Sequence, residues 1–200
     1  MDRVLLRAAE KLTYVDPASY LMRLRRLEIE IAASDTPPKV KALRTNDLKA
    51  AREQRQAALF CLAMGQRLGQ KVSFAAREDQ DYDFIASWIV GEERHIATVQ
   101  LKEVVPAQAN PQASIHAIVA SLTKYTNSDG LTVAIHLNRE GRFDPCLLQV
   151  PKLKIGSLWV FGSANPDQSR WNLWGNFKES DAYATQFSYP EAHPVERSGD

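Results

Sequence analysis

The chain has 200 residues, of which 44% are hydrophobic and 24% are charged, and its formal net charge is +1. These proportions are typical of a globular domain with a packed core. They exclude a membrane-spanning helix, because no hydrophobic run approaches the roughly 18 residues that such a helix requires. Two cysteines are too few for a disulfide framework and lack the spacing of a metal site. We therefore expect a cytoplasmic protein that binds no membrane.

Charge is distributed unevenly along the chain. Residues 1–77 contain 15 Lys and Arg against 8 Asp and Glu, whereas residues 78–200 contain 10 against 16. A basic region can contact a polyanion, and an acidic region can hold a cation. Ordinary solvated surfaces produce the same drift in charge, so both interpretations stay open at this point.

Two helices are predicted in residues 1–38, which we treat as an N-terminal helical extension. Residues 1–12 space their charged and hydrophobic side chains as an amphipathic helix does, and no signal-peptide cleavage site follows. Asp16 followed by Pro17 is typical of a helix start, with an aspartate cap and a proline in the first turn. Residues 36–38, Thr-Pro-Pro, are expected to end this second helix.

Residues 46–138 are expected to form the core of the domain. A long helix comes first and stops at Gly69, since glycine is common just after a helix C-terminus. Hydrophobic residues then alternate with a period of two, which predicts strands, before helical spacing returns. The expected elements are, in chain order, a helix, a strand, the two strands of a hairpin, a crossover helix and a central strand: 46–68, 71–76, 83–90, 95–105, 110–126 and 131–138.

The C-terminal third of the chain carries weaker signals. Residues 139–177 are expected to add strands, around 146–150, 156–162 and 170–175. Residues 178–200 are polar and contain two prolines, which predicts a loose tail. The chain as a whole, residues 1–200, is predicted to be a single α/β domain with a mixed sheet flanked by helices.

The hairpin brings polar side chains together at its open end. With a turn near 91–92, the numbers of paired residues sum to roughly 183 to 185, which sets Asp83 opposite Gln100 to Lys102. Gln100 and Lys102 share one face, because side chains alternate along a strand. A carboxylate, an amide and an ammonium can therefore converge there.

This set of groups suits phosphodiester hydrolysis assisted by a divalent cation. Mg²⁺ prefers oxygen ligands and often takes only one or two carboxylates. Asp83, the Gln100 side-chain carbonyl and the main-chain carbonyl of Leu101 are candidate ligands. Lys102 is expected to orient the attacking water or to offset negative charge that develops on the phosphate.

Asp83, followed seventeen residues later by Gln100-Leu101-Lys102, resembles the D…(E/Q)xK motif of the PD-(D/E)XK nuclease superfamily. The order of elements over residues 46–138 also resembles the three-layer core of restriction endonucleases. The resemblance implies a Mg²⁺- or Mn²⁺-dependent endonuclease that hydrolyses DNA, and possible homodimers. It also implies catalytic roles for Asp83, Gln100 and Lys102, and for Glu53 on the first core helix.

Two residues depart from the usual pattern of the superfamily. Tyr82 stands where proline commonly precedes the aspartate, and Gln100 stands where glutamate is commoner. Glutamine removes one negative charge, which is expected to weaken metal binding. One alternative is therefore a catalytically inactive nuclease-fold module that binds nucleic acid or a protein partner. Another is an unrelated α/β domain in which Gln100 and Lys102 lie on a solvated sheet face.

Other residues compete for these roles. Asp81 has the same strand parity as Asp83 and could replace it as a ligand. Glu53 lies on a hydrophobic stripe, yet it is close enough to the helix start to reach solvent. Glu103 is expected on the opposite face from Gln100, in contact with solvent or a cation. His95, His116 and His136 lack the spacing of metal ligands, so we interpret them as structural.

Basic residues near this core are candidates for contact with DNA phosphates. Arg52 and Arg55 lie on the long helix, and Lys124 lies near the end of the crossover helix. A solvated helix face is the alternative for such residues. Trp159, Trp171 and the other aromatic residues of the C-terminal strands are interpreted as core rather than as a base-stacking surface.

Overall fold

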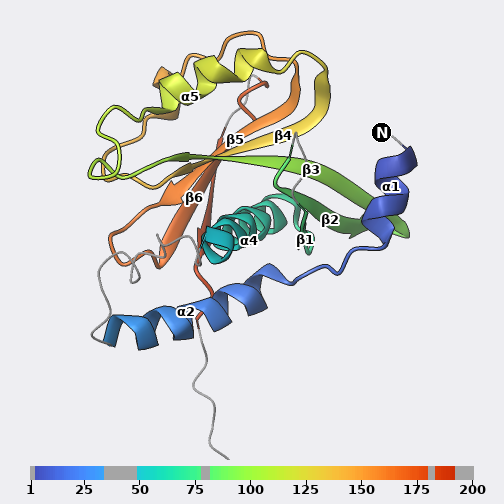
Figure 1. Ribbon diagram of the computed structural model, residues 1–200, viewed down its shortest axis with the longest axis horizontal. Coiled ribbons are helices and arrows are strands. Elements are labelled where there is room, and N and C mark those ends of the chain that lie inside the picture. Colours follow the sequence, from blue (N-terminus) through green and yellow to red (C-terminus); the bar gives the residue numbers. More distant parts are fainter. Residues whose placement is uncertain (1–2, 34–48, 78–81, 180–182, 192–200) are drawn as a thin grey trace, which may run out of the picture.

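The computed structural model describes residues 3–33, 49–77, 82–179 and 183–191 (Figure 1). The expected helix end at 36–38, the expected helix start at 46 and the alternative ligand Asp81 lie outside these residues. The helices are α1 (Arg3–Glu10), α2 (Pro17–Ala33), α4 (Lys49–Leu68) and α5 (Ile115–Ser121), with short 3₁₀ helices η2 (Leu122–Lys124) and η3 (Pro145–Leu147). The strands are β1 (Ser73–Ala76), β2 (Phe84–Val90), β3 (Glu93–Val104), β4 (Ser128–Leu137), β5 (Ile155–Ser163), β6 (Arg170–Gly175) and β7 (Tyr183–Ser188).

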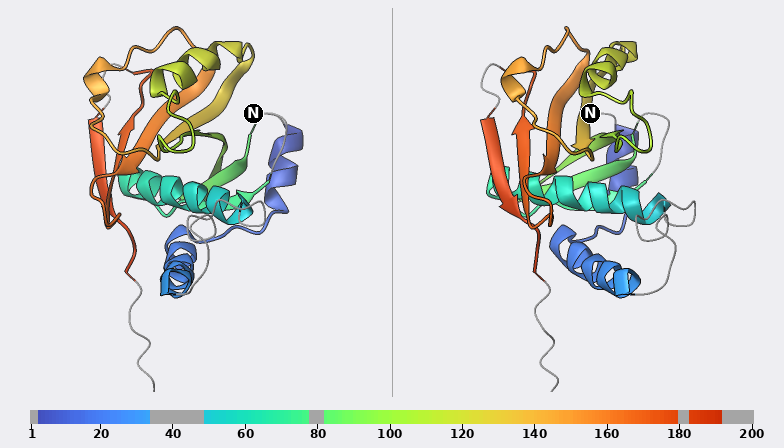
Figure 2. Two further views of the ribbon diagram at one scale, coloured as in Figure 1. Left: turned by 60° about the vertical axis from the view of Figure 1, so that its left-hand side comes forward. Right: turned by 90° about the vertical axis from the view of Figure 1, so that its left-hand side faces the viewer.

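The seven strands form one mixed sheet, in which spatial order follows chain order. β1, β2 and β3 are antiparallel, β3, β4 and β5 are parallel, and β5, β6 and β7 are antiparallel. The parallel step from β3 to β4 requires a crossover, which α5 and η2 provide. The sheet curls around α4, and α5 lies on its other side (Figures 1 and 2). The predicted mixed α/β architecture is confirmed.

Side chains that alternate along the strands belong to two separate hydrophobic cores, one on each face of the sheet. Phe84 and Val99 point to one face and pack with Phe60 of α4. Ile85 and Ile135 point to the other face and pack with residues of α5 and η2. The central strands are hydrophobic on both sides because helices cover both faces, as expected for parallel strands in an α/β fold. α2 packs on the outside of α4 and adds a further layer (Figure 2).

Local sequence signals explain the helix ends. The main-chain amide of Ser19 donates to Oδ2 of Asp16 at 2.9 Å, so Asp16 caps α2 as predicted. Gly69 has a φ of 62°, the left-handed conformation that ends α4. Among the described residues, no helix has both the length and the hydrophobicity needed to cross a membrane.

One predicted helix near the centre of the chain begins later than expected, and one predicted strand does not form. α5 begins at Ile115 rather than 110, because the Ser114 hydroxyl caps it by accepting from the Ala117 amide at 3.1 Å. No strand forms at 146–150. Asp144 instead caps η3 by accepting a hydrogen bond from the Cys146 amide at 3.0 Å. Leu148 and Val150, which follow η3, pack against the core on the α5 side.

The prediction of a loose tail from residue 178 is wrong for residues 183–189. They form β7 and its continuation, paired antiparallel with β6. Phe187 and Tyr189 are buried in the core on the α4 side, and the Tyr189 hydroxyl donates to the Leu21 carbonyl of α2 at 3.2 Å. Two aromatic side chains at alternate positions thus hold this segment to the sheet.

Candidate active site

The register of the β2–β3 hairpin sets the geometry of the candidate site. Phe84 pairs with Val99, a sum of 183, which lies at the lower end of the expected range. The main-chain amide of Asp83 continues the ladder by donating to the Val99 carbonyl at 2.9 Å. Asp83 therefore stands opposite Gln100, just before β2 begins.

The Asp83 carboxylate joins the two strands at this end. Its Oδ2 atom accepts a hydrogen bond from the main-chain amide of Leu101 at 2.6 Å. The same oxygen accepts from Nε2 of Gln100. On the other side of the amide, the Tyr125 hydroxyl donates to Oε1 of Gln100 at 3.5 Å. The structure thus brings Asp83, Gln100 and Leu101 together, and it adds Tyr125.

Lys102 lies on the same face of β3 as Gln100. Both residues pair with β4 residues, Val133 and Ile135, that belong to the core on the α5 side. Lys102 is half-buried, and burial lowers the pKa of its ammonium group. The Asp83 carboxylate raises that pKa, and the nearby ammonium of Lys124 lowers it further. Lys102 is therefore within electrostatic reach of both residues.

Glu53 approaches Asp83 from the other side of the sheet. A cavity of about 210 Å³ lies between α4, β1 and the start of β2, and Glu53, Asp83 and Leu101 all line it. Its remaining walls include Phe74, Phe84, Ala57 and Arg77. Asp83 thus connects two environments, because its carboxylate contacts Gln100 while the residue also lines the cavity with Glu53.

The donor set is compatible with a hard divalent cation. The residues Asp83, Glu53 and Leu101 all line one cavity, and Mg²⁺ in proteins often takes no more than two carboxylates. Among the residues that the structure describes, no group of three or more His, Cys, Asp and Glu is placed to hold a metal. Gln100 directs its amide nitrogen, not its oxygen, toward Asp83, so the amide has to rotate before its oxygen can face a cation there.

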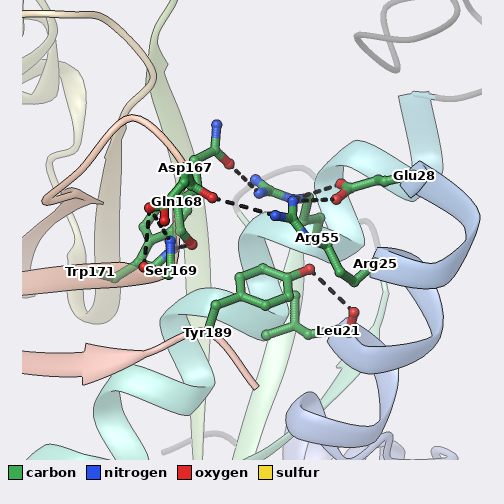
Figure 3. Close-up of polar contacts among 9 residues, drawn as sticks. All are labelled: Leu21, Arg25, Glu28, Arg55, Asp167, Gln168, Ser169, Trp171 and Tyr189. Carbon is green, nitrogen blue, oxygen red and sulfur yellow. Dashed lines mark hydrogen bonds and ion pairs between the residues drawn. The ribbon is translucent and has the colours of Figure 1, made fainter. Parts of the chain in front are cut away.

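The three basic candidates for DNA contact have different surroundings. Lys124 is exposed, and its Nζ lies 5.4 Å from the centre of the Tyr125 ring. Arg52 is partly buried on α4. Arg55 lies inside a junction between α2, α4 and the β5–β6 loop (Figure 3). Its Nε lies 3.2 Å from Oε1 of Glu28, and its Nη2 donates to Oε1 of Gln168 at 2.6 Å.

Polar residues on the α4 side form a separate network. Glu103 lies on the face opposite Gln100, as predicted, but its partners are two amides rather than solvent. Its Oε2 accepts from Nε2 of Gln56 at 3.1 Å, and its Oε1 accepts from Nδ2 of Asn138 at 2.6 Å. His136 is buried beside this network and stacks on Phe161 with ring centres 5.0 Å apart.

Two of the histidines in the described part of the chain stack on aromatic rings, and a third is exposed. Burial, with a contribution from Arg55, lowers the pKa of His136 to about 3. His95 stacks on Trp88 with ring centres 5.4 Å apart, and His116 is exposed. Sequence reasoning missed Tyr125 as part of the site. The feature that could have indicated Tyr125 is its position just after the helix that leads from β3 to the adjacent parallel strand β4.

Comparison of the chain with known protein families, curated proteins and solved structures finds no match.

Proposed function

We propose that the protein is a Mg²⁺- or Mn²⁺-dependent endonuclease that hydrolyses phosphodiester bonds in DNA, with a restriction-endonuclease-like core. The observation that carries this proposal is the meeting of Asp83, Gln100 and Leu101 at the open end of the hairpin, within electrostatic reach of Lys102. The order α4, β1, β2, β3, α5, β4 also agrees with the order of elements in that core.

Each residue has a role that follows from its chemistry. Asp83 and Glu53 would hold the cation, with the carbonyl of Leu101 and, after rotation, the amide oxygen of Gln100. When bound, the cation lowers the pKa of a coordinated water and polarises the phosphoryl oxygen. Lys102 is placed to orient the water or to stabilise negative charge on the phosphate as the bond breaks.

The test is cleavage of plasmid DNA and of modified DNA in Mg²⁺ or Mn²⁺. Asp83→Asn keeps an oxygen that can accept from the Leu101 amide, so the hairpin is retained while the metal ligand loses its charge. We expect Asp83→Asn and Lys102→Ala each to lower the cleavage rate at least about 100-fold. Matched controls are Glu92→Gln and Lys152→Ala, since both residues are exposed and Glu92 lies at the turn, the opposite end of the hairpin from Asp83. Cleavage that survives both substitutions would disprove the proposal.

A second candidate function follows from the contact between Gln100 and Asp83. The amide of Gln100 donates to one oxygen of the Asp83 carboxylate, which favours a nuclease-fold module that binds nucleic acid without cutting it. Salt-sensitive DNA binding with no cleavage in either metal supports this candidate. Gln100→Glu then provides a direct check, because restoring the carboxylate is expected to create or strengthen metal binding.

A further inference from the structure

Two lysines approach the Gln100 side of the candidate site from different elements. Lys102 comes from β3 and is half-buried, whereas Lys124 ends η2 and is exposed. The ammonium of Lys124 lies over the Tyr125 ring, 5.4 Å from its centre. The hydroxyl of the same ring reaches Oε1 of Gln100 at 3.5 Å. Lys124, Tyr125 and Gln100 therefore form a continuous surface beside Lys102.

The balance of charge on this surface favours an anion. Lys102 and Lys124 repel each other, and Asp83 is the carboxylate whose charge acts on Lys102. One oxygen of Asp83 already accepts hydrogen bonds from the Leu101 amide and the Gln100 amide. Gln100 is neutral, so it supplies no charge to offset the second lysine. Two ammonium groups beside one carboxylate leave one positive charge uncompensated, which an anion can offset.

We propose, building on the nuclease function proposed above, that Lys102, Lys124 and the Tyr125 hydroxyl form a phosphate-binding surface that works without a metal ion. Its ligand is a phosphate group, either a phosphodiester of the DNA backbone or free phosphate. Ammonium groups bind phosphate as point charges, and the Tyr125 hydroxyl can donate its one proton to a phosphate oxygen in place of Oε1 of Gln100. Lys124 thus contacts DNA beside the reacting phosphate.

This surface and the carboxylate cavity divide the site into two parts. Glu53 and Asp83 line the cavity on the α4 side, and the lysines lie on the α5 side. Gln100 is neutral where a glutamate would carry a negative charge. The carboxylate cavity therefore binds a cation less strongly, and the lysine surface binds an anion more strongly. DNA is therefore expected to bind in EDTA, before any metal enters.

The experiment measures duplex DNA binding to the full chain by fluorescence anisotropy in EDTA, between about 50 and 200 mM salt. We expect Lys124→Ala to weaken binding about 3- to 10-fold and to reduce the slope of log affinity against log salt by about 0.9, the value for one lost phosphate contact. Lys124→Arg keeps the charge and is expected to retain binding. Lys154→Ala is the matched control, since Lys154 is also exposed. Thermal unfolding checks that each variant is folded.

Inorganic phosphate separates the two sources of the ligand. Displacement of DNA by millimolar phosphate, reduced in Lys124→Ala, indicates a site for phosphate itself. Displacement that requires DNA competitors indicates a site for the phosphodiester backbone. Unchanged affinity and salt slope in both Lys124→Ala and Lys102→Ala would overturn the inference, as would a wild-type protein that binds neither ligand in EDTA. DNA binding through these lysines without cleavage would contradict the nuclease proposal and leave this one standing.

Discussion

The two faces of β3 place neighbouring polar residues in different surroundings. Glu103 faces α4, where amides of Gln56 and Asn138 donate to both of its carboxylate oxygens. Gln100 and Lys102 face the α5 side, where two lysines act on each other beside one carboxylate. A partly buried carboxylate whose two oxygens both accept hydrogen bonds mainly stabilises the fold. The half-buried surface at Lys102, where two ammonium groups lie beside one carboxylate, is typical of a ligand site. The comparison predicts that substitutions in the Glu103 network on the α4 side change stability, whereas substitutions at Lys102 and Lys124 on the α5 side change binding.

Arg55→Ala is expected to have the largest effect on stability. The Arg55 guanidinium pairs with Glu28, donates to Gln168 and lies 5.5 Å from the Trp171 ring centre (Figure 3). Its loss leaves Glu28 with its ion pair to Arg25 and removes the link that joins α4 to both Glu28 of α2 and Gln168 of the β5–β6 loop. We expect the free energy of unfolding, measured in urea, to fall by about 3 kcal/mol. Arg170→Ala, on an exposed position, is the control and is expected to change little. A small loss in Arg55→Ala would show that this junction is not structural.

Glu103→Ala is expected to have the next largest effect. The substitution removes the acceptor of two amides, one of which belongs to the buried Gln56 side chain. We expect the free energy of unfolding to fall by about 2 kcal/mol, with DNA affinity unchanged. Glu93→Ala tests the same chemical change at an exposed position of the same strand. If Glu103→Ala abolished DNA binding without loss of stability, the division between the two faces would be wrong.

Part of this arrangement could be predicted from the sequence because it depends on short-range rules. Counting from the turn predicts Asp83 opposite Gln100 to Lys102, and the structure has the lower end of that range, with Phe84 paired to Val99. Strict alternation then assigns Gln100 and Glu103 to opposite faces. The N-cap at Asp16 and the helix end at Gly69 are equally local.

The remaining features depend on contacts that are distant in sequence. Phe187 and Tyr189 form only a weak strand signal until Trp171 and α2 are in place to bury them. Arg55 looks like any cation on an exposed helix face until the β5–β6 loop brings Gln168 to it. Tyr125 fits the hydrophobic stripe of a helix, and its hydroxyl gains a role only when the crossover sets it beside Gln100. Periodicity carries none of this information.

His136 is expected to make stability depend on pH on the α4 side. The folded-state pKa is about 3 and the ordinary value is 6.5, so the unfolded chain gains a proton first as the pH falls. Stability is therefore complete above pH 6.5 and falls as the pH drops from 6.5 toward 3. At pH 5 the loss is about 2 kcal/mol, at about 1.4 kcal/mol per pH unit.

Urea unfolding at several pH values checks the role of His136. His136→Phe keeps an aromatic ring against Phe161 and is expected to remove this part of the pH dependence. His116→Gln, at an exposed position, is expected to leave it in place. The change in stability with pH is the readout, because the absolute stability of His136→Phe also reflects how the larger ring packs. A pH profile shared by all three proteins would exclude His136 as the cause.

Lys102→Met is expected to have the smallest effect on stability, and of the opposite sign. Burial and the charge of Lys124 lower the pKa of Lys102 below its ordinary 10.5, so the ammonium form is destabilised in the folded protein. Replacing it with a neutral side chain of similar length should raise the free energy of unfolding by less than about 1 kcal/mol, since water screens a half-exposed charge.

The sign of this effect gives a second check. The unfolded chain holds the Lys102 proton to a higher pH than the folded one, so wild-type stability should rise relative to Lys102→Met as the pH approaches 10.5. Lys154→Met, at an exposed position, should show no such trend. A clear loss of stability in Lys102→Met would mean that Lys102 serves the fold, as Glu103 does. A gain in stability accompanied by weaker DNA binding would mean that the protein retains an unfavourable charge because its ligand requires it.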